Sequence, residues 1–175
     1  MSEDVFARGP HDSGDVPEVA ILMGSASDWS TMKMCAAKLT ELGVGFEVRV
    51  ISAHRTPERH GTYVGKAKER GTKVFICAAG VAAHLAGVTA ATTDLPVIGV
   101  PMKGGVSDGL DALLSTVQMP AGVPVATVAI GSHGARNAAI LALQMLSLGD
   151  AGHAERLARM RTEQSAEVPM YPAED

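Results

Sequence analysis

Two short segments, each with one histidine, are the parts of this sequence best suited to acid–base chemistry. They are Ser52–Pro57 (SAHRTP) and Ala82–Leu85 (AAHL). Histidine passes protons near neutral pH, and the guanidinium group of arginine is suited to clamp a phosphate. We therefore expect His54 to carry a proton and Arg55 to bind an anion. For His84, a capping or packing role in its alanine-rich turn is as well supported as proton transfer.

A third segment, Gly24–Asp28 (GSASD), offers a place for a phosphate. It follows an apolar run and begins a stretch with helical periodicity, and the N-terminus of a helix attracts anions. Its two serine hydroxyls add hydrogen-bond donors, and Asp28 can accept from ribose hydroxyls. An equally weighted alternative is that Ser27 or Asp28 only caps the helix. The segment has neither the GxGxxG nor the GxxxxGK[ST] pattern, so it favours a mononucleotide over a dinucleotide or ATP.

A repeated strand–turn–helix pattern has to position these segments. Short apolar runs predict strands, and apolar residues at helical spacing predict the helices between them. The repeat predicts an α/β fold, a three-layer doubly wound parallel sheet of flavodoxin or Rossmann type, in a single domain with a C-terminal helix. The expected strands are 18–23, 46–51, 74–78, 96–100 and 125–130, and the expected helices lie at about 32–42, 57–70, 85–91, 110–117, 135–148 and 151–163. The pattern leaves the strand order open.

The two ends of the chain differ from this repeat. Residues 1–16 are polar and irregular, which predicts a flexible N-terminal arm, and residues 166–175 predict a C-terminal tail. The folded domain is then expected at residues 17–165.

The turns that follow the expected strands should meet at one edge of the sheet. Ligands of open parallel sheets bind where loops leave the carboxyl ends of the strands. Four turns with polar residue types fall at such positions, namely 24–28, 52–57, 79–84 and 131–134. His133, in the last of them, is a weaker candidate because Gly131–Gly134 also fits an ordinary strand-to-helix turn. The sequence therefore predicts one cleft, with acid–base chemistry by histidine on a phosphate-bearing ligand.

The composition argues against several other classes of protein. A net charge of −4 and a pI near 5.8 disfavour a nucleic-acid binder that neutralises many phosphates. The histidines and acids have no metal-ligand spacing, so we expect no metal. Cys35 and Cys77 lie inside apolar segments, which predicts that both are buried, unpaired cysteines of a protein in a reducing compartment. No segment has the apolar length of a membrane span or the pattern of a signal peptide, which predicts a cytoplasmic protein.

Taken together, the motifs resemble those of a known family. Met23–Trp29 (MGSASDW), Ser52–Pro57, Ala82–Leu85 and Val117–Pro120 (VQMP) have the order and spacing of the N5-carboxyaminoimidazole ribonucleotide mutases, the catalytic subunit of phosphoribosylaminoimidazole carboxylase. The resemblance covers about Val19 to Leu148. It implies an isomerase of de novo purine biosynthesis that moves a carboxylate reversibly from the exocyclic amine of an aminoimidazole ribonucleotide to ring carbon C4. It also implies that no metal, ATP or organic cofactor takes part.

The resemblance also implies roles for individual residues. His54 matches the catalytic histidine, which protonates the carbamate nitrogen as CO2 departs and later removes the C4 proton. His84 matches a second histidine of the site. Ser25, Asp28 and Arg55 match residues that hold the ribose phosphate. The full set of expected substrate-binding residues is Ser25, Ser27, Asp28, Ser52, Ala53, Arg55, Gly80, Ala82 and Leu85. The family forms octamers with active sites between subunits, and apolar residues around Leu141–Leu148 suit such an interface.

Some positions depart from the family's pattern. The turn before His84 reads Gly80-Val81 where a Gly-Gly pair is usual, and Ala86 stands where a proline is usual. Since valine does not easily adopt a positive φ, we expect the His84 turn to differ in shape. The stretch Lys103–Asp108 is also more polar and richer in glycine than the family's pattern.

Two alternatives to the mutase function are kept. A second class of the family carboxylates aminoimidazole ribonucleotide directly with CO2, but its members resemble Ser-Ala-His-Lys after the second strand and lack Ala-Ala-His-Leu. Trp29, Arg55 and His84 therefore favour the mutase. The other alternative is a non-catalytic, flavodoxin-like nucleotide-binding module, which the fold alone allows. The combination of His54, Arg55 and Ser25 favours catalysis instead.

Overall fold

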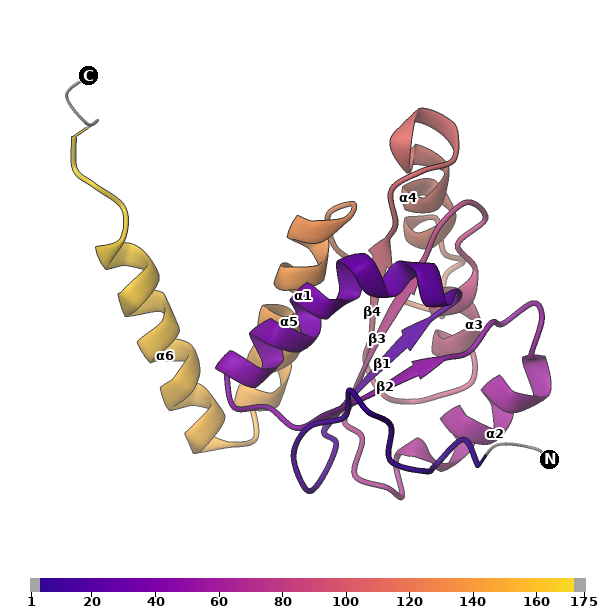
Figure 1. Cartoon of the computed structure of the whole chain (residues 1–175), viewed down its shortest axis with the longest axis horizontal. Coiled ribbons are helices and arrows are strands. Elements are labelled where there is room, and N and C mark those ends of the chain that lie inside the picture. Colours follow the sequence, from indigo (N-terminus) through magenta and orange to yellow (C-terminus); the bar gives the residue numbers. More distant parts are fainter. Residues whose placement is uncertain (1–3, 172–175) are drawn as a thin grey trace.

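A parallel sheet of five strands forms the centre of the structure, a computed structural model that describes residues 4–171 (Figure 1). The strands are β1 (Val19–Met23), β2 (Phe46–Val50), β3 (Val74–Ala79), β4 (Val97–Pro101) and β5 (Ala126–Thr127). Their order is β2-β1-β3-β4-β5, and all pairs are parallel. β2 lies on one side of β1, and the later strands follow on its other side, beginning with β3. Doubly wound folds bind their ligands at this switch point between β1 and β3.

Helices cover both faces of the sheet. On one face lie α1 (Trp29–Glu41) and α5 (Ser132–Ser147), and on the other lie α2 (Pro57–Ala67), α3 (Leu85–Ala90) and α4 (Leu110–Val117). Successive residues of β1 point to opposite faces, so Ile21 packs into the first cluster and Leu22 into the second. The predicted three-layer, doubly wound α/β fold is confirmed.

Small residues let the layers approach closely, which suits a chain with few aromatic side chains. Four alanines of α5, Ala135, Ala138, Ala139 and Ala142, are fully buried against α1 and the sheet. On the opposite face, a Cβ at Gly99 of β4 would collide with the side chain of Thr116 in α4. These close approaches fix the positions of the helices that carry or support the candidate site.

The predicted element boundaries agree with the structure to within three residues except at β5. The sequence predicts a strand over residues 125–130, but the strand covers only Ala126–Thr127. β5 is an edge strand that pairs with β4 alone, so strand hydrogen bonds stabilise it on one side only. After it the chain continues beside β4, where the N–H of Val128 donates to the carbonyl of Gly99 at 3.0 Å and the N–H of Gly131 to that of Pro101 at 2.9 Å.

The C-terminal helix α6 (Ala151–Ala166) extends away from the body of the molecule (Figure 1). Its first turn is tied to the sheet by His153, which is buried. His153 Nδ1 accepts a hydrogen bond from Arg156 at 3.1 Å, while its Nε2 lies 3.0 Å from a Glu18 carboxylate oxygen. Because the arginine can only donate, the imidazole carries its proton on Nε2 and donates it to Glu18.

The apolar segment expected to form a subunit interface is mostly buried within the chain. Leu143 and Leu146 pack into the core beneath α1 and α6, and only Leu148 is exposed, at 90%. The exposed apolar surface expected at Leu141–Leu148 is therefore found only at Leu148, and a subunit interface at this segment stays a prediction. Further exposed apolar side chains lie along α4, at Leu110, Leu114 and Val117.

Arg49 of β2 holds the described part of the N-terminal arm against the domain. Its guanidinium donates to the carbonyls of Val5 and Ala7 and forms an ion pair with Asp12 at 2.9 Å. Phe6 stacks on Tyr63 of α2, with 6.1 Å between ring centroids. The flexibility expected for residues 1–16 stays a prediction, and these contacts favour a tethered course from residue 4 onward.

The C-terminal tail follows the last helix. The tail expected at 166–175 begins where α6 ends at Ala166, and residues 172–175 lie outside the described part. Within residues 4–171, no helix combines the length and apolar character needed to cross a membrane.

Candidate active site

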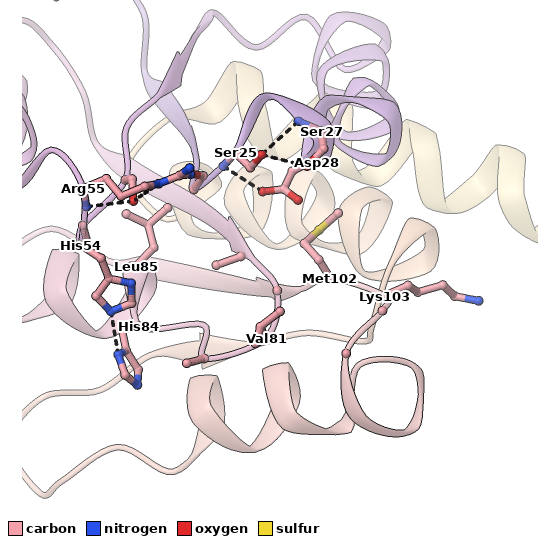
Figure 2. Close-up of a pocket in the computed structure, with 18 residues that line it drawn as sticks. Ser25, Ser27, Asp28, His54, Arg55, Val81, His84, Leu85, Met102 and Lys103 are labelled. Atoms are coloured by element: carbon pink, nitrogen blue, oxygen red, sulfur yellow. Dashed lines mark hydrogen bonds between the residues drawn. The ribbon is translucent and has the colours of Figure 1, made fainter.

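One cavity of about 460 Å³ lies at the carboxyl edge of the sheet (Figure 2). Its volume is that of a small-molecule site. The loops after β1, β2 and β3 line it, and they bring together all the site residues expected from the sequence. These are Ser25, Ser27, Asp28, Ser52, Ala53, His54, Arg55, Gly80, Ala82, His84 and Leu85. We call this cavity the pocket; its geometry agrees with the predicted cleft, and the role of each residue stays a prediction.

The loop after β1 builds an anion-attracting end of the pocket. Residues Ala26–Asp28 form a short 3-10 turn that runs directly into α1, and Ser25 caps it by accepting from the N–H of Ser27 at 3.3 Å. Asp28 reaches back to the N–H of Ser25 at 3.1 Å through one carboxylate oxygen. The cap is therefore Ser25, not Ser27 or Asp28 as the capping alternative held, and it orients the serine hydroxyls and the carboxylate along the pocket wall (Figure 2).

Burial changes the acidity of Asp28. Loss of solvent raises the pKa of this carboxyl above its usual value, and the hydrogen bond from Ser25 opposes the rise only in part. A partly desolvated carboxylate is a strong acceptor for hydroxyl groups, since few water molecules compete for it. The arrangement favours neutral donors such as sugar hydroxyls at Asp28.

Arg55 joins the loops after β1 and β2. One terminal nitrogen donates to the carbonyl of Gly24 at 2.7 Å, and Nε lies 3.3 Å from the hydroxyl of Ser52. Pro57 begins α2, whose first turn follows this loop directly. The guanidinium is therefore held beside the Ser25 loop by two neutral partners, and its charge is available to an anion in the pocket.

The two histidines of the sequence motifs meet in the pocket. His54 Nε2 lies 2.9 Å from His84 Nδ1, with the rings edge to face at 77° (Figure 2). A hydrogen bond of this kind needs a proton on one nitrogen and a lone pair on the other. The pair can thus hold a proton and pass it on. The alternative in which His84 only packs within its turn is disfavoured by this geometry, because the imidazole faces another titratable side chain.

The other histidines have positions consistent with structural or surface roles. His60 is buried in α2 and lies 2.9 Å from the hydroxyl of Thr89, and its burial lowers its pKa. His133 is exposed and does not line the pocket. The turn 131–134 lies at the expected edge but contributes no pocket residue, so the expected cleft of four turns is wrong in this one part.

The loop after β4 takes the place of that turn. Met102, Lys103, Gly104 and Gly105 line the pocket. None of these four residues belongs to the set of site residues expected from the sequence, since only Lys103 has a reactive side chain. The polar, glycine-rich composition of the stretch was the one available signal. Its glycines are required by the backbone, since Gly104 and Gly105 both have positive φ.

In the turn before His84, Val81 adopts a positive φ despite its branched side chain, so the expectation that valine avoids this conformation is wrong, and a turn shape that differs from the family's stays a prediction. Val81 has a φ of 57°, a conformation that disfavours branched side chains, and its side chain is 63% exposed at the pocket wall. The left-handed conformation costs a non-glycine residue about 1–2 kcal/mol. The turn is therefore strained next to the histidine pair.

Substituting Val81→Gly is expected to raise the free energy of unfolding by about 1 kcal/mol. Glycine removes the strain of the folded turn, but the greater flexibility of the unfolded chain offsets part of that stabilisation. Urea denaturation of both proteins measures the change. Ala82→Gly is the matched control, since Ala82 is exposed and has no positive φ. That control should lose about 0.5–1 kcal/mol. Equal losses in both variants would contradict strain at Val81.

The described residues offer no obvious place for a metal ion. Within residues 4–171, no three His, Cys, Asp or Glu side chains are clustered closely enough to hold one. The two thiols are buried away from the pocket, and burial raises the pKa of Cys77 to about 12. Neither thiol is therefore suited to act as a nucleophile.

Comparison with known proteins agrees with this geometry. A family model described as AIR carboxylase matches residues 18–167. The N5-carboxyaminoimidazole ribonucleotide mutase of Mycobacterium tuberculosis strain H37Rv is 59% identical over 134 residues, covering 77% of this chain and 76% of that protein. The protein of the same name from Vibrio parahaemolyticus is 51% identical over 160 residues, covering 90% and 99%.

Two further similarities extend this picture. A bifunctional purine synthesis protein of Dictyostelium discoideum is 58% identical over 131 residues, which is 75% of this chain but 13% of that larger protein. The crystal structure of Treponema denticola PurE superimposes with a TM-score of 0.79 at 28% identity, covering 86% of this chain and 93% of that one.

Proposed function

The chain belongs to the AIR carboxylase family, and on that basis we propose that it is an N5-carboxyaminoimidazole ribonucleotide mutase of purine biosynthesis. It converts this substrate reversibly into 4-carboxy-5-aminoimidazole ribonucleotide. The observation that carries the proposal is the His54–His84 contact of 2.9 Å in a pocket that also contains Arg55 and the capped turn at Ser25. The pocket thus combines a proton carrier with an anion-binding end.

The anion-binding end receives the ribose phosphate. Arg55 supplies the positive charge, and the hydroxyls of Ser25 and Ser27 supply neutral donors at the start of α1. Asp28, with one oxygen on the N–H of Ser25, accepts from the sugar hydroxyls. This orientation directs the imidazole ring of the substrate toward the loops of His54 and His84.

The reaction transfers carbon dioxide within the pocket. The bond between the carboxylate carbon and the exocyclic nitrogen breaks, and His54 protonates that nitrogen as CO2 leaves. CO2 then forms a bond to C4, and His54 takes the C4 proton, which restores its starting state. His84 orients the imidazole of His54 through their shared hydrogen bond. The apolar groups of Ala79, Ala82 and Leu85 line the same wall and limit the water that competes with CO2.

We further propose that the protein works as a cytoplasmic homo-oligomer, an octamer on the family resemblance. The exposed side chains of Leu110, Leu114 and Val117 follow one face of α4 and are available for contact with a second copy. A net charge of −4 gives no basis for a nucleic-acid partner.

Product formation from two substrates under CO2-depleted conditions tests the function. One reaction contains N5-carboxyaminoimidazole ribonucleotide alone, and the other contains aminoimidazole ribonucleotide with added bicarbonate. Fast conversion of the first and little of the second is expected. Activity with only the second would identify a direct carboxylase, and no activity with either would leave a nucleotide-binding protein.

A further inference from the structure

The turn that carries His84 is held by a hydroxyl from outside the pocket. Ser115 lies on α4, and its Oγ accepts a hydrogen bond from the N–H of Ala83 at 2.9 Å. The same oxygen lies 3.3 Å from the carbonyl of Val81. Within residues 4–171, no other side chain is hydrogen-bonded to the backbone of residues 80–83. Ser115 does not line the pocket, so it acts on the site only through this turn.

The hydroxyl of Ser115 satisfies a buried donor. Ala83 is 1% exposed, so its N–H needs a partner within the protein. The hydroxyl's own proton goes to the carbonyl of Asp111, four residues earlier on α4, at 2.7 Å. Ser115 thus bonds to its own helix as a donor and to the turn as an acceptor, which joins α4 to the segment between β3 and α3.

The position of this bond links it to the histidine pair. Ala83 directly precedes His84, the N-cap residue of α3, whose imidazole lies 2.9 Å from His54. Two residues earlier, Val81 holds a φ of 57°, which an unrestrained valine would leave. Without the bond, the strained turn can relax and carry the His84 ring away from His54. We propose that Ser115 is a positioning residue that keeps His84 in contact with His54.

This role differs from a general contribution to folding. α4 is fixed in the core by Ala112 and Thr116, which are buried, and Thr116 packs on Gly99 of β4, whereas Ser115 is only partly buried. Removing its hydroxyl therefore leaves the helix in place and frees the turn. The proposal rests on the mutase function and assigns Ser115 to the catalytic step, not to substrate binding.

Three substitutions separate the hydrogen bond from the size of the side chain. Ser115→Ala and Ser115→Cys remove a strong acceptor, and the second keeps nearly the same volume. Ser115→Thr keeps the hydroxyl, and the bond from the Thr116 hydroxyl to the carbonyl of Ala112 shows that this helix accommodates a threonine in that geometry. Ser147→Ala is the matched control, because Ser147 makes a similar bond within its own helix, to Gln144 at 2.7 Å, away from the pocket.

Steady-state kinetics with N5-carboxyaminoimidazole ribonucleotide measure the effect, with the unmodified protein assayed in parallel and folding checked by thermal unfolding. We expect kcat to fall about tenfold to a hundredfold in S115A and S115C with KM within threefold, since small displacements at a reacting centre have effects of that size. S115T and S147A should stay within threefold in kcat.

The outcomes distinguish this inference from the proposed function. An inactive unmodified protein would refute the function itself. An active unmodified protein with a fully active S115A would overturn the role of Ser115, as would a rise in KM at constant kcat. Loss of kcat in S115T equal to that in S115A would also overturn it, because the hydroxyl would then not be the group that matters. If S115A unfolds, the comparison of S115C with S115T decides in the same way.

Discussion

Replacing His54 by asparagine is expected to lower kcat by at least about a thousandfold while leaving the fold intact. Asparagine is close in size to histidine and can hydrogen-bond to His84, but it cannot accept and return a proton. General acid–base catalysis contributes about 10²–10⁴-fold, and in the proposed reaction the same side chain acts in both proton transfers. The measurement is steady-state turnover of N5-carboxyaminoimidazole ribonucleotide.

The structure supplies a matched control for this experiment. His133 is an exposed histidine at the same edge of the sheet that does not line the pocket, so His133→Asn should retain activity within about twofold. Circular dichroism and size-exclusion chromatography show whether His54→Asn keeps its fold and its assembly. Turnover within a few-fold of the unmodified protein would remove His54 from the catalytic role, whatever its contact with His84.

Replacing Arg55 by alanine is expected to raise KM by about tenfold to a hundredfold with a much smaller change in kcat. The phosphate lies away from the reacting atoms, so Arg55 contacts it equally in the ground state and the transition state. A charge-assisted hydrogen bond contributes about 1.5–3 kcal/mol, which corresponds to this range of affinity. Substrate-saturation curves measure the two constants separately.

Two further variants test whether geometry or charge matters at this position. Arg55→Lys keeps a charge but loses the branched guanidinium that reaches both Gly24 and Ser52. We therefore expect its KM to lie between those of the unmodified protein and of Arg55→Ala. Arg59→Ala, on the exposed side of α2, should leave both constants unchanged. A loss of kcat at constant KM in Arg55→Ala would instead place Arg55 at the reacting end of the substrate.

Several features of the candidate site could be predicted because they follow from local patterns. Apolar runs and helical periodicity gave the strands and helices, and a parallel sheet brings the carboxyl ends of its strands to one edge. His54, Arg55 and Ser25 each directly follow such a strand, so their meeting in one pocket required no knowledge of strand order. The φ preference of valine, by contrast, misled at position 81, because Val81 holds a positive φ that single-residue preferences disfavour.

Other features depend on contacts between residues far apart in the chain. The turn 131–134 follows a strand as the other three do, yet Met102–Gly105 lines the pocket in its place. β5 lies at the edge of the sheet, farthest from the switch point between β1 and β3, and the loop after β4 lies nearer to it. Likewise, the burial of Leu143 and Leu146 in α5 and the anchor of α6 at His153 depend on tertiary contacts that no spacing revealed.

The fold class, the order of the elements and the residue types at the active edge follow from local sequence patterns, because they depend on hydrophobic period, turn chemistry and the direction of parallel strands. The strand order, the 2.9 Å contact between His54 and His84, and the bond from Ser115 to the turn before His84 are set by contacts between distant parts of the chain. The bond from Ser115, for example, depends on the close approach of α4 to the sheet at Gly99. That approach is a sum of many weak contacts across the whole domain, and no local pattern encodes it.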